Sequence, residues 1–216
     1  MKIQFFKNLI KRHNRNTTPN LVSGFTIVEA IVAVFILSIS ISAMLGLTVS
    51  SYSSAKYANN ELTANYLLQE AVDAIRNSRD TMVFQKSGVN ATNWSAFLTA
   101  YGKDTSSSCF SNNGCGVSIG SYFTPGTPST FVSACTADTQ GLGGSTIPCS
   151  ALQYDDSAQG GSYYSSTSGS ASRFKRQVKM VSTDANKVEV TVTVEYPNGT
   201  TFKIRTLKMN LLNWQN

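Results

Sequence analysis

The feature that most constrains this chain is a long apolar run near its N-terminus that contains one acid. The run begins at Phe25, and the 26 residues from Ala30 to Ala55 carry no charge. Its most apolar part, Phe25 to Val49, would measure about 37 Å as a helix, which exceeds the ~30 Å hydrocarbon core of a membrane. Glu29 lies inside the run, where a carboxylate is unfavourable unless it has a partner. The role of Glu29 therefore decides what this segment can do.

The charge of the chain is concentrated ahead of the apolar run. The formal net charge of +6 comes from 18 Lys and Arg residues and 12 Asp and Glu residues. Five basic residues and no acid precede Gly24: Lys2, Lys7, Lys11, Arg12 and Arg15. The remaining 13 basic residues nearly balance the 12 acids, so net charge does not indicate a general polyanion-binding surface. The positive flank places residues 1–24 in the cytoplasm and the rest of the chain outside.

Residues for catalysis and metal binding are scarce. The one histidine, His13, lies in the basic segment, so a chain that has lost this segment has no Ser-His-Asp, Cys-His or His-ligated metal site. Asp155 and Asp156 adjoin a Ser/Gly-rich stretch. They are a candidate calcium pair, with a solvated turn as the simpler interpretation. We expect a chain that is not an enzyme and needs no cofactor.

Four cysteines occur in a turn-rich middle region: Cys109, Cys115, Cys135 and Cys149. An even number of cysteines in an exported chain indicates disulfides, and no CxxC spacing indicates zinc or redox chemistry. Three connectivities are open, with four reduced thiols as the other alternative. Local pairing, Cys109 with Cys115 and Cys135 with Cys149, closes the shortest loops and is our prediction.

Three interpretations of the apolar run compete. A secretory signal peptide would be cut after the run, near Ser40 and Ser42, but such signals have a shorter and uncharged apolar core. A plain transmembrane anchor leaves Glu29 without a partner. Cleavage after Gly24, ahead of the run, would create a positive amine on Phe25 that could pair with Glu29 of the same chain or a neighbouring one.

The sequence Gly24-Phe25-Thr26-Ile27-Val28-Glu29, followed by about twenty apolar residues, resembles the prepilin motif of type IV pilins and type II secretion pseudopilins. The resemblance implies that a membrane peptidase cuts after Gly24 and methylates the amine of Phe25. It also implies that Glu29 pairs with the N-terminus of an adjacent subunit during filament assembly. The implied partners are other pilin subunits, the prepilin peptidase, the inner-membrane assembly machinery and, before assembly, membrane lipid. Gly46 falls where many members have a residue that lets the helix melt, or is a tolerated glycine.

The helix is expected to continue beyond the membrane. Leu68, Ala71, Val72 and Ile75 share one face at helical spacing, which predicts packing against a domain. The sequence thus predicts five segments: a leader (1–24), a membrane and assembly half of the helix (25–50), a soluble half (51–80), a loop-rich region with the cysteines (81–172) and an antiparallel meander (173–216). Within the loop-rich region, residues 93–101 predict a short helix with Trp94, Phe97 and Leu98 in the core.

The C-terminal region predicts three antiparallel strands. Residues 187–196 alternate strictly, with four valines and Tyr196 on one face. A three-residue loop, Pro197-Asn198-Gly199, would place Val194 opposite Phe202. The apolar residues Phe202 and Ile204 have even numbers, whereas the later ones, Leu207, Met209 and Leu211, have odd numbers and would point to the other face. We therefore expect a β-bulge near Arg205–Thr206 that returns them to the same face. The helix around Leu62–Ile75 should cover the apolar face of the sheet.

The predicted fold class is α+β, with a long N-terminal helix packed on a C-terminal antiparallel sheet of three or four strands and a disulfide-bearing loop region. This arrangement resembles the pilin domain. The valine-rich hairpin and the ending Met209–Trp214 look most like those of minor pilins.

A set of basic residues near the C-terminus is a candidate polyanion contact: Arg173, Lys175, Arg176, Lys179, Lys203 and Arg205. If these side chains shared the outer face of the sheet, they would form a strip suited to DNA uptake, while the simpler interpretation is solubility and edge-strand protection. The sequence as a whole favours a minor pilin or pseudopilin of a type IV pilus-like filament. The alternatives are a secreted or anchored binding module such as an adhesin, or a DNA-uptake pseudopilin.

Overall fold

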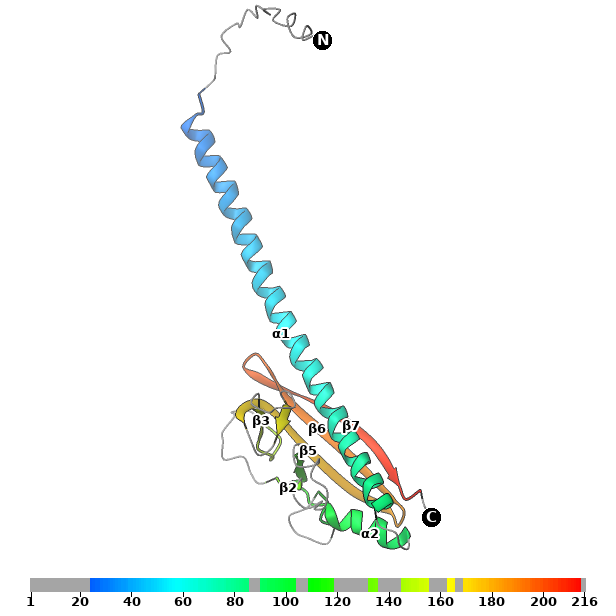
Figure 1. Ribbon diagram of the computed structural model, residues 1–216. Coiled ribbons are helices and arrows are strands. Elements are labelled where there is room, and N and C mark those ends of the chain that lie inside the picture. Colours follow the sequence, from blue (N-terminus) through cyan, green and yellow to red (C-terminus); the bar gives the residue numbers. More distant parts are fainter. Residues whose placement is uncertain are drawn as a thin grey trace, which may run out of the picture. The chain divides into compact units, whose positions relative to one another are not determined.

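The computed structural model describes residues 24–85, 90–103, 109–118, 132–135, 145–155, 163–165 and 169–214 (Figure 1). By its internal contacts the chain divides into two compact units, Met1–Ser50 and Ser51–Asn216. The described part of the first unit is almost entirely helical, and the second unit contains the sheet. The predicted leader lies outside the described residues apart from Gly24.

Two helices and seven strands make up the described chain. The helices are α1 (Ile27–Gln85) and α2 (Asn90–Ala100). The strands are β1 (Cys115–Val117), β2 (Val132–Ala134), β3 (Ala151–Asp155), β4 (Tyr163–Ser165), β5 (Ser170–Asp184), β6 (Lys187–Asn198) and β7 (Thr201–Leu212).

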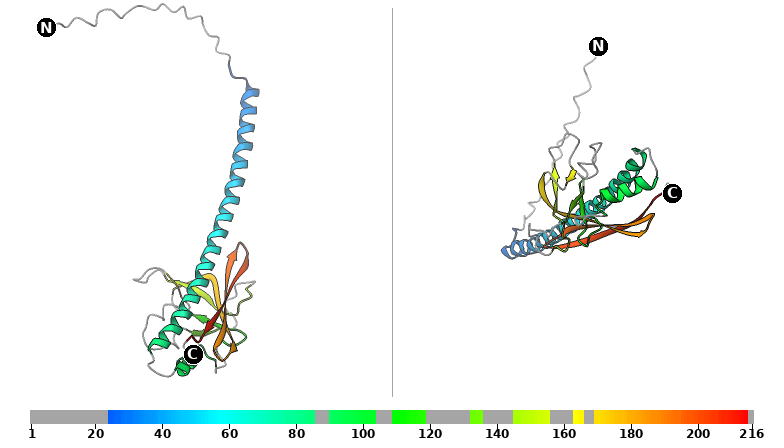
Figure 2. Two further views of the ribbon diagram at one scale, coloured as in Figure 1. Left: turned by 90° about the vertical axis from the view of Figure 1, so that its right-hand side faces the viewer. Right: turned by 90° about the horizontal axis from the view of Figure 1, so that it is seen from below.

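All seven strands belong to one antiparallel sheet organised around β5. Strand β5 pairs with β6 along one edge and with β3 and β1 along the other. Strands β2 and β4 extend the sheet beyond β1 and β3, and β7 follows β6. Figure 2 shows the part of α1 that belongs to the second unit lying across one face of the sheet formed by β5, β6 and β7. The predicted α+β class and the C-terminal meander are therefore confirmed, and four short strands of the loop-rich region enlarge the sheet.

The core lies between the sheet and the helices, on what we call the inner face. The alternating residues of β6, Val188, Val190, Val192, Val194 and Tyr196, are each 0% exposed. They pack with the core segment of α1, defined here as Ala64–Ile75. Its predicted stripe of Leu68, Ala71, Val72 and Ile75 is buried as expected, whereas Leu62 is 55% exposed. The alternating residues of β6 and the helically spaced residues of α1 therefore pack together in one core, as the sequence predicted.

Helix α2 closes one end of this core. Trp94, Phe97 and Leu98 are all buried, as the sequence predicted. The Trp94 indole N–H donates to the carbonyl of Ala185, at 2.9 Å, in the turn between β5 and β6. The ring of Phe97 contacts the rings of Trp94 and Tyr101, with centroid separations of 5.5 and 4.9 Å.

The register of the β6–β7 hairpin differs from the prediction. Asn198 pairs with Thr201 and Val194 with Arg205, so the loop is the two-residue Gly199-Thr200. Gly199 has φ +62°, which suits the first central position of such a hairpin turn. The three-residue loop and the pairing of Val194 with Phe202 are therefore wrong.

The predicted bulge near Arg205–Thr206 is also wrong, because the register runs unbroken from Asn198–Thr201 to Lys187–Leu212. In this register the valines of β6 lie directly opposite Leu207, Met209 and Leu211, so no bulge is needed to bring these residues to the same face. Leu211 is buried, while Phe202 and Ile204 turn to the outer face, where Ile204 is 44% exposed. The apolar residues at the end of β7 set the register, because they complete the core under α1.

Both disulfides have the predicted local pairing. Cys109 is bonded to Cys115, and Cys135 to Cys149. The first bond fixes a tight turn against β5, where the Gln177 amide donates to the Asn113 carbonyl at 2.7 Å. Gly114 has φ +66°, and a Cβ there would lie 2.5 Å from the Val178 carbonyl oxygen, so the turn requires glycine. The second disulfide forms a separate buried cluster with Ile147, and the adjoining Ser145 and Thr146 bond to Glu195, whose side chain lies on the outer face of β6.

Candidate functional site

The candidate processing site lies just ahead of α1. Gly24, Phe25 and Thr26 are exposed and non-helical, and α1 begins at Ile27. Among the residues that the structure describes, no atom lies within 4 Å of the Cβ position of Gly24 apart from its own chain neighbours. The Gly24–Phe25 peptide bond is therefore accessible and free of helical hydrogen bonding, which are the conditions a peptidase needs.

Glu29 occupies the first turn of α1 and is exposed. Its backbone N–H donates to the Thr26 hydroxyl at 3.3 Å, so Thr26 is the N-cap of the helix. Thr26 and Glu29 have the spacing of a capping box, in which a glutamate three residues after the cap stabilises the helix start. The bond present is the one in which Thr26 caps the helix; this role of Thr26 was not foreseen, although Ser/Thr-x-x-Glu ahead of an apolar run is its signature.

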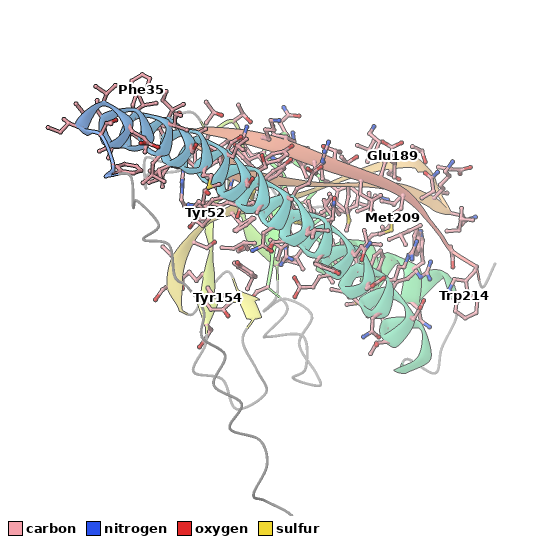
Figure 3. The ribbon with its side chains drawn as sticks, turned by 90° about the horizontal axis from the view of Figure 1, so that it is seen from above. Phe35, Tyr52, Tyr154, Glu189, Met209 and Trp214 are labelled. Carbon is pink, nitrogen blue, oxygen red and sulfur yellow. A yellow bond between two sulfur atoms is a disulfide. The ribbon has the colours of Figure 1, made fainter. Side chains whose placement is uncertain are left out.

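The residues that follow Glu29 are apolar on every side of the helix. The apolar segment, defined here as Phe25–Val49, leaves its large side chains between 49% and 80% exposed in the described chain; Phe35 is one example (Figure 3). A helix that is apolar all round is typical of a membrane span. Within the described residues, α1 is the one helix long and apolar enough to cross a membrane, which is compatible with a single-pass anchor.

The hydroxyl groups of the apolar segment are satisfied within the helix. Ser38, Ser40, Ser42 and Thr48 each donate to the carbonyl four residues earlier, at 2.8–2.9 Å. These bonds remove the cost of placing a hydroxyl in hydrocarbon. Gly46 is helical with no close neighbour. Glu29 is the one Asp, Glu, Lys or Arg residue between Phe25 and Ala55.

The six basic candidates do not share one face of the sheet. On β5 the side chains alternate, so Arg173, Lys175 and Lys179 point to the outer face and Arg176 points to the inner face. Lys203 and Arg205 pair with Tyr196 and Val194 across the hairpin, which places them on the inner face as well.

The predicted outer-face basic strip is therefore corrected. The sequence-based register had turned Lys203 and Arg205 outward, and a one-residue change reverses every side chain of a strand. Burial removes two further members, because Lys175 and Arg176 are each 1% exposed. The outer face retains the exposed Arg173 and the half-buried Lys179.

Arg176 instead holds the core segment of α1 against the sheet. One guanidinium nitrogen, Nη1, lies 2.9 Å from the Glu70 carboxylate and 3.3 Å from the Leu67 carbonyl. The other, Nη2, donates to the Val117 carbonyl of β1 at 2.6 Å. Burial lowers the pKa of the Arg176 guanidinium, and the Glu70 carboxylate opposes that shift. Arg176 thus joins α1, β1 and β5 at a single buried charge.

A second polar cluster joins α1 to the β6–β7 hairpin. The Arg205 guanidinium is hydrogen-bonded to the Glu61 carboxylate, and Lys203 Nζ donates to the Tyr57 hydroxyl at 3.3 Å while lying 4.6 Å from its ring centroid. Arg205 holds the pKa of Glu61 below its ordinary value. Burial, with a contact to the Tyr57 hydroxyl, raises the pKa of Tyr196 to about 12. Two of the six candidates for polyanion contact, Lys203 and Arg205, are thus already bonded to side chains of α1.

The structure assigns no metal site to the remaining candidates. Asp155 ends β3, and Asp156 lies outside the described residues. Among the described residues, no three His, Cys, Asp or Glu side chains form a group that could hold a metal ion. No family model, curated protein or solved structure matches this chain.

Proposed function

We propose that the chain is a structural subunit of a type IV pilus-like filament, a minor pilin or pseudopilin. The observation that carries the proposal is the apolar segment, which buries none of its large side chains in the described chain and contains a single acid five residues after Gly24. Such a segment has to be covered by lipid, by other chains or by each in turn.

The proposed order of events starts in the membrane. The five basic residues ahead of Gly24 keep the leader in the cytoplasm and leave the disulfide-bonded unit outside, where disulfides persist. A peptidase then cuts the exposed Gly24–Phe25 bond and methylates the new amine of Phe25. The retained helix anchors the subunit until it enters the filament.

Glu29 supplies the attraction in this proposal. A carboxylate in hydrocarbon is costly alone and much less costly beside a cation. The amine of Phe25 on a neighbouring subunit is such a cation, and it exists only after the leader has been removed. Head-to-tail contacts that repeat without closing generate filaments, so one pairing of this kind per subunit couples processing to assembly.

The capping-box spacing of Thr26 and Glu29 gives this proposal a sharp test, because a residue at the Glu29 position can support the helix start without carrying a charge. Glutamine can replace glutamate in a capping box, so Glu29→Gln preserves the helix start and removes the negative charge. Thr26→Ala has the converse effect, since it removes the cap and leaves the charge. Both variants would be expressed at equal levels, and subunits in sheared filaments would be counted by immunoblotting.

We expect Glu29→Gln to be cleaved after Gly24 but to be nearly absent from filaments, and Thr26→Ala to enter them. The opposite result, with Glu29→Gln assembling and Thr26→Ala failing, would reduce Glu29 to a helix cap and overturn the assembly role. Retention of full-length precursor in both variants would instead place these residues in peptidase recognition.

A further inference from the structure

The outer edge of β7 is a long strand edge that no other described strand covers. Strand β7 has twelve residues and pairs with β6 alone (Figure 1). Its register shows no bulge, and it contains no proline. Natural sheets normally blunt such edges by shortness, bulges, proline or charge, and of these β7 has only its basic residues.

The hydrogen bonding of the hairpin shows which backbone groups are available. Asn213 N–H donates to the Asn186 carbonyl at 2.9 Å, so this opposed pair is hydrogen-bonded. Bonded and non-bonded pairs alternate in an antiparallel ladder. The N–H and C=O groups of five residues therefore point away from β6: Phe202, Ile204, Thr206, Lys208 and Asn210. The next group in this series, the Leu212 carbonyl, accepts a bond from Arg79 of α1 at 3.5 Å, which marks the end of the open edge.

The side chains beside this edge are apolar or basic. Ile204, Leu207 and Leu212 are 44%, 38% and 54% exposed. The strand carries Lys203, Arg205 and Lys208 and no acid. Lys208, whose side chain is 64% exposed, bonds to Glu189 on the outer face; Figure 3 shows Glu189 and Met209 on opposite sides of the sheet. A strand added here would meet exposed aliphatic side chains and three basic ones, of which Arg205 and Lys208 each have one acidic partner.

A second copy of this chain is a poor complement. Pairing β7 with another β7 would bring like-charged basic side chains together, which is unfavourable. The sheet's other end strands, β2 and β4, have three residues each and no acid. A longer strand that alternates acidic and apolar residues would complement both the charge and the exposed side chains.

We propose that the open edge of β7 binds an extended, acidic segment of another protein as an additional strand of the sheet. Backbone bonds to the five outward residues supply affinity, and charge supplies selectivity. This inference does not depend on the filament proposal, because it uses only the second unit of the chain.

The test uses the full-length chain in detergent micelles and two blocked peptides, TEVEVET and the charge-reversed TKVKVKT. Hydrogen exchange is measured at single amides. The free protein should exchange rapidly at Ile204, Thr206 and Lys208 and slowly at Arg205 and Leu207. The acidic peptide should slow the rapid set and bind about tenfold more tightly than the basic peptide.

A matched pair of variants locates the contact. Thr206→Pro removes one outward N–H that no described strand uses and should weaken binding at least about tenfold, whereas Thr206→Val keeps the N–H and should bind as wild type. If Thr206→Pro does not fold, the proposal is still tested by the exchange pattern of the wild-type protein and by its relative affinity for the two peptides. Equal binding of both peptides, protection away from β7, or protection without peptide that grows with protein concentration would each overturn the proposal; the last would identify a second copy as the occupant.

Discussion

The two parts of α1 use apolar residues in opposite ways. In the apolar segment, isoleucines such as Ile36 remain 58% exposed, and apolar residues surround the helix. In the core segment, Ile75 is 0% exposed, and the opposite face carries polar residues such as Asp73. The distinction lies in the arrangement of the apolar positions: a stripe packs on a sheet, whereas a continuous apolar surface requires an apolar surrounding. Folding of the second unit should therefore depend on the core segment and not on the apolar segment.

The largest effect is expected where a charge is buried against the core segment. Arg176→Met removes a fully buried guanidinium and leaves Glu70 and two carbonyl groups without their donor, so the free energy of unfolding should fall by about 3 to 5 kcal/mol. Urea unfolding of the full chain in detergent, followed by tryptophan fluorescence, measures it. Arg76→Met is the control, because the Arg76 side chain is 54% exposed and lies 4.0 Å from Asp73; it should change stability by less than about 0.5 kcal/mol. Equal losses of stability in Arg176→Met and Arg76→Met would contradict the stabilising role of the buried Arg176 contacts.

The direct comparison of the two parts of α1 uses one substitution at two sites. Ile75→Ala leaves a cavity in the core and should lower the free energy of unfolding by roughly 2 to 5 kcal/mol. Ile36→Ala, in the apolar segment, should leave the same unfolding transition unchanged. A matching loss at both sites would show that the apolar segment contributes to the folded core, and the distinction between the two segments would fail.

Removing the cover of the outer face should have a smaller effect. Cys135→Ser with Cys149→Ser opens a loop with a sequence separation of 14, and the chain-entropy model gives a loss of about 3 kcal/mol at most. The core segment packs on the other face, so the variant should keep its helix content by circular dichroism before unfolding. Loss of helix content under native conditions would show that the two faces are not independent.

The smallest effect concerns the contact between α1 and the hairpin. Arg205 lowers the pKa of Glu61 from its ordinary value of 4.5, so the ionised form stabilises the folded state above that value. This contribution is lost as pH falls from about 4.5 through the lower folded pKa. The stability difference between wild type and Glu61→Gln should therefore shrink as pH falls from 6 to 3. A difference that does not change with pH would show that the pair contributes nothing.

Local patterns predicted most of this architecture. The valines of β6 and the stripe from Leu68 to Ile75 each define one face without knowledge of the partner, which is why the helix, the meander and the core were predictable. The short cysteine loops likewise favoured their observed pairing. The membrane-length run and the residues around Gly24 are also read directly from the sequence.

The errors concern positions where two sets of residues compete. Phe202 and Ile204 have one parity on β7, and Leu207, Met209 and Leu211 have the other, so only contact with α1 decides between them. The sequence-based register followed Phe202 and Ile204, and it therefore placed Lys203 and Arg205 on the wrong face of the sheet. The inward position of Arg176 follows from the alternation along β5, but its partners Glu70 and Val117 are distant in sequence, so its contacts could not be predicted locally. The short strands β1–β4 are defined by long-range pairing, which local composition does not reveal.

The central claim is that Gly24 marks a cleavage site and that the apolar segment is retained. Mass spectrometry of the N-terminal peptide, from protein isolated from its native cells, tests it most directly. We expect a chain that begins at Phe25 and carries one additional methyl group on its amine. A chain that begins near Ala43 would identify an ordinary secreted domain and leave Glu29 without an assembly role, and an intact Met1 would identify a simple anchor. Either result would contradict the account.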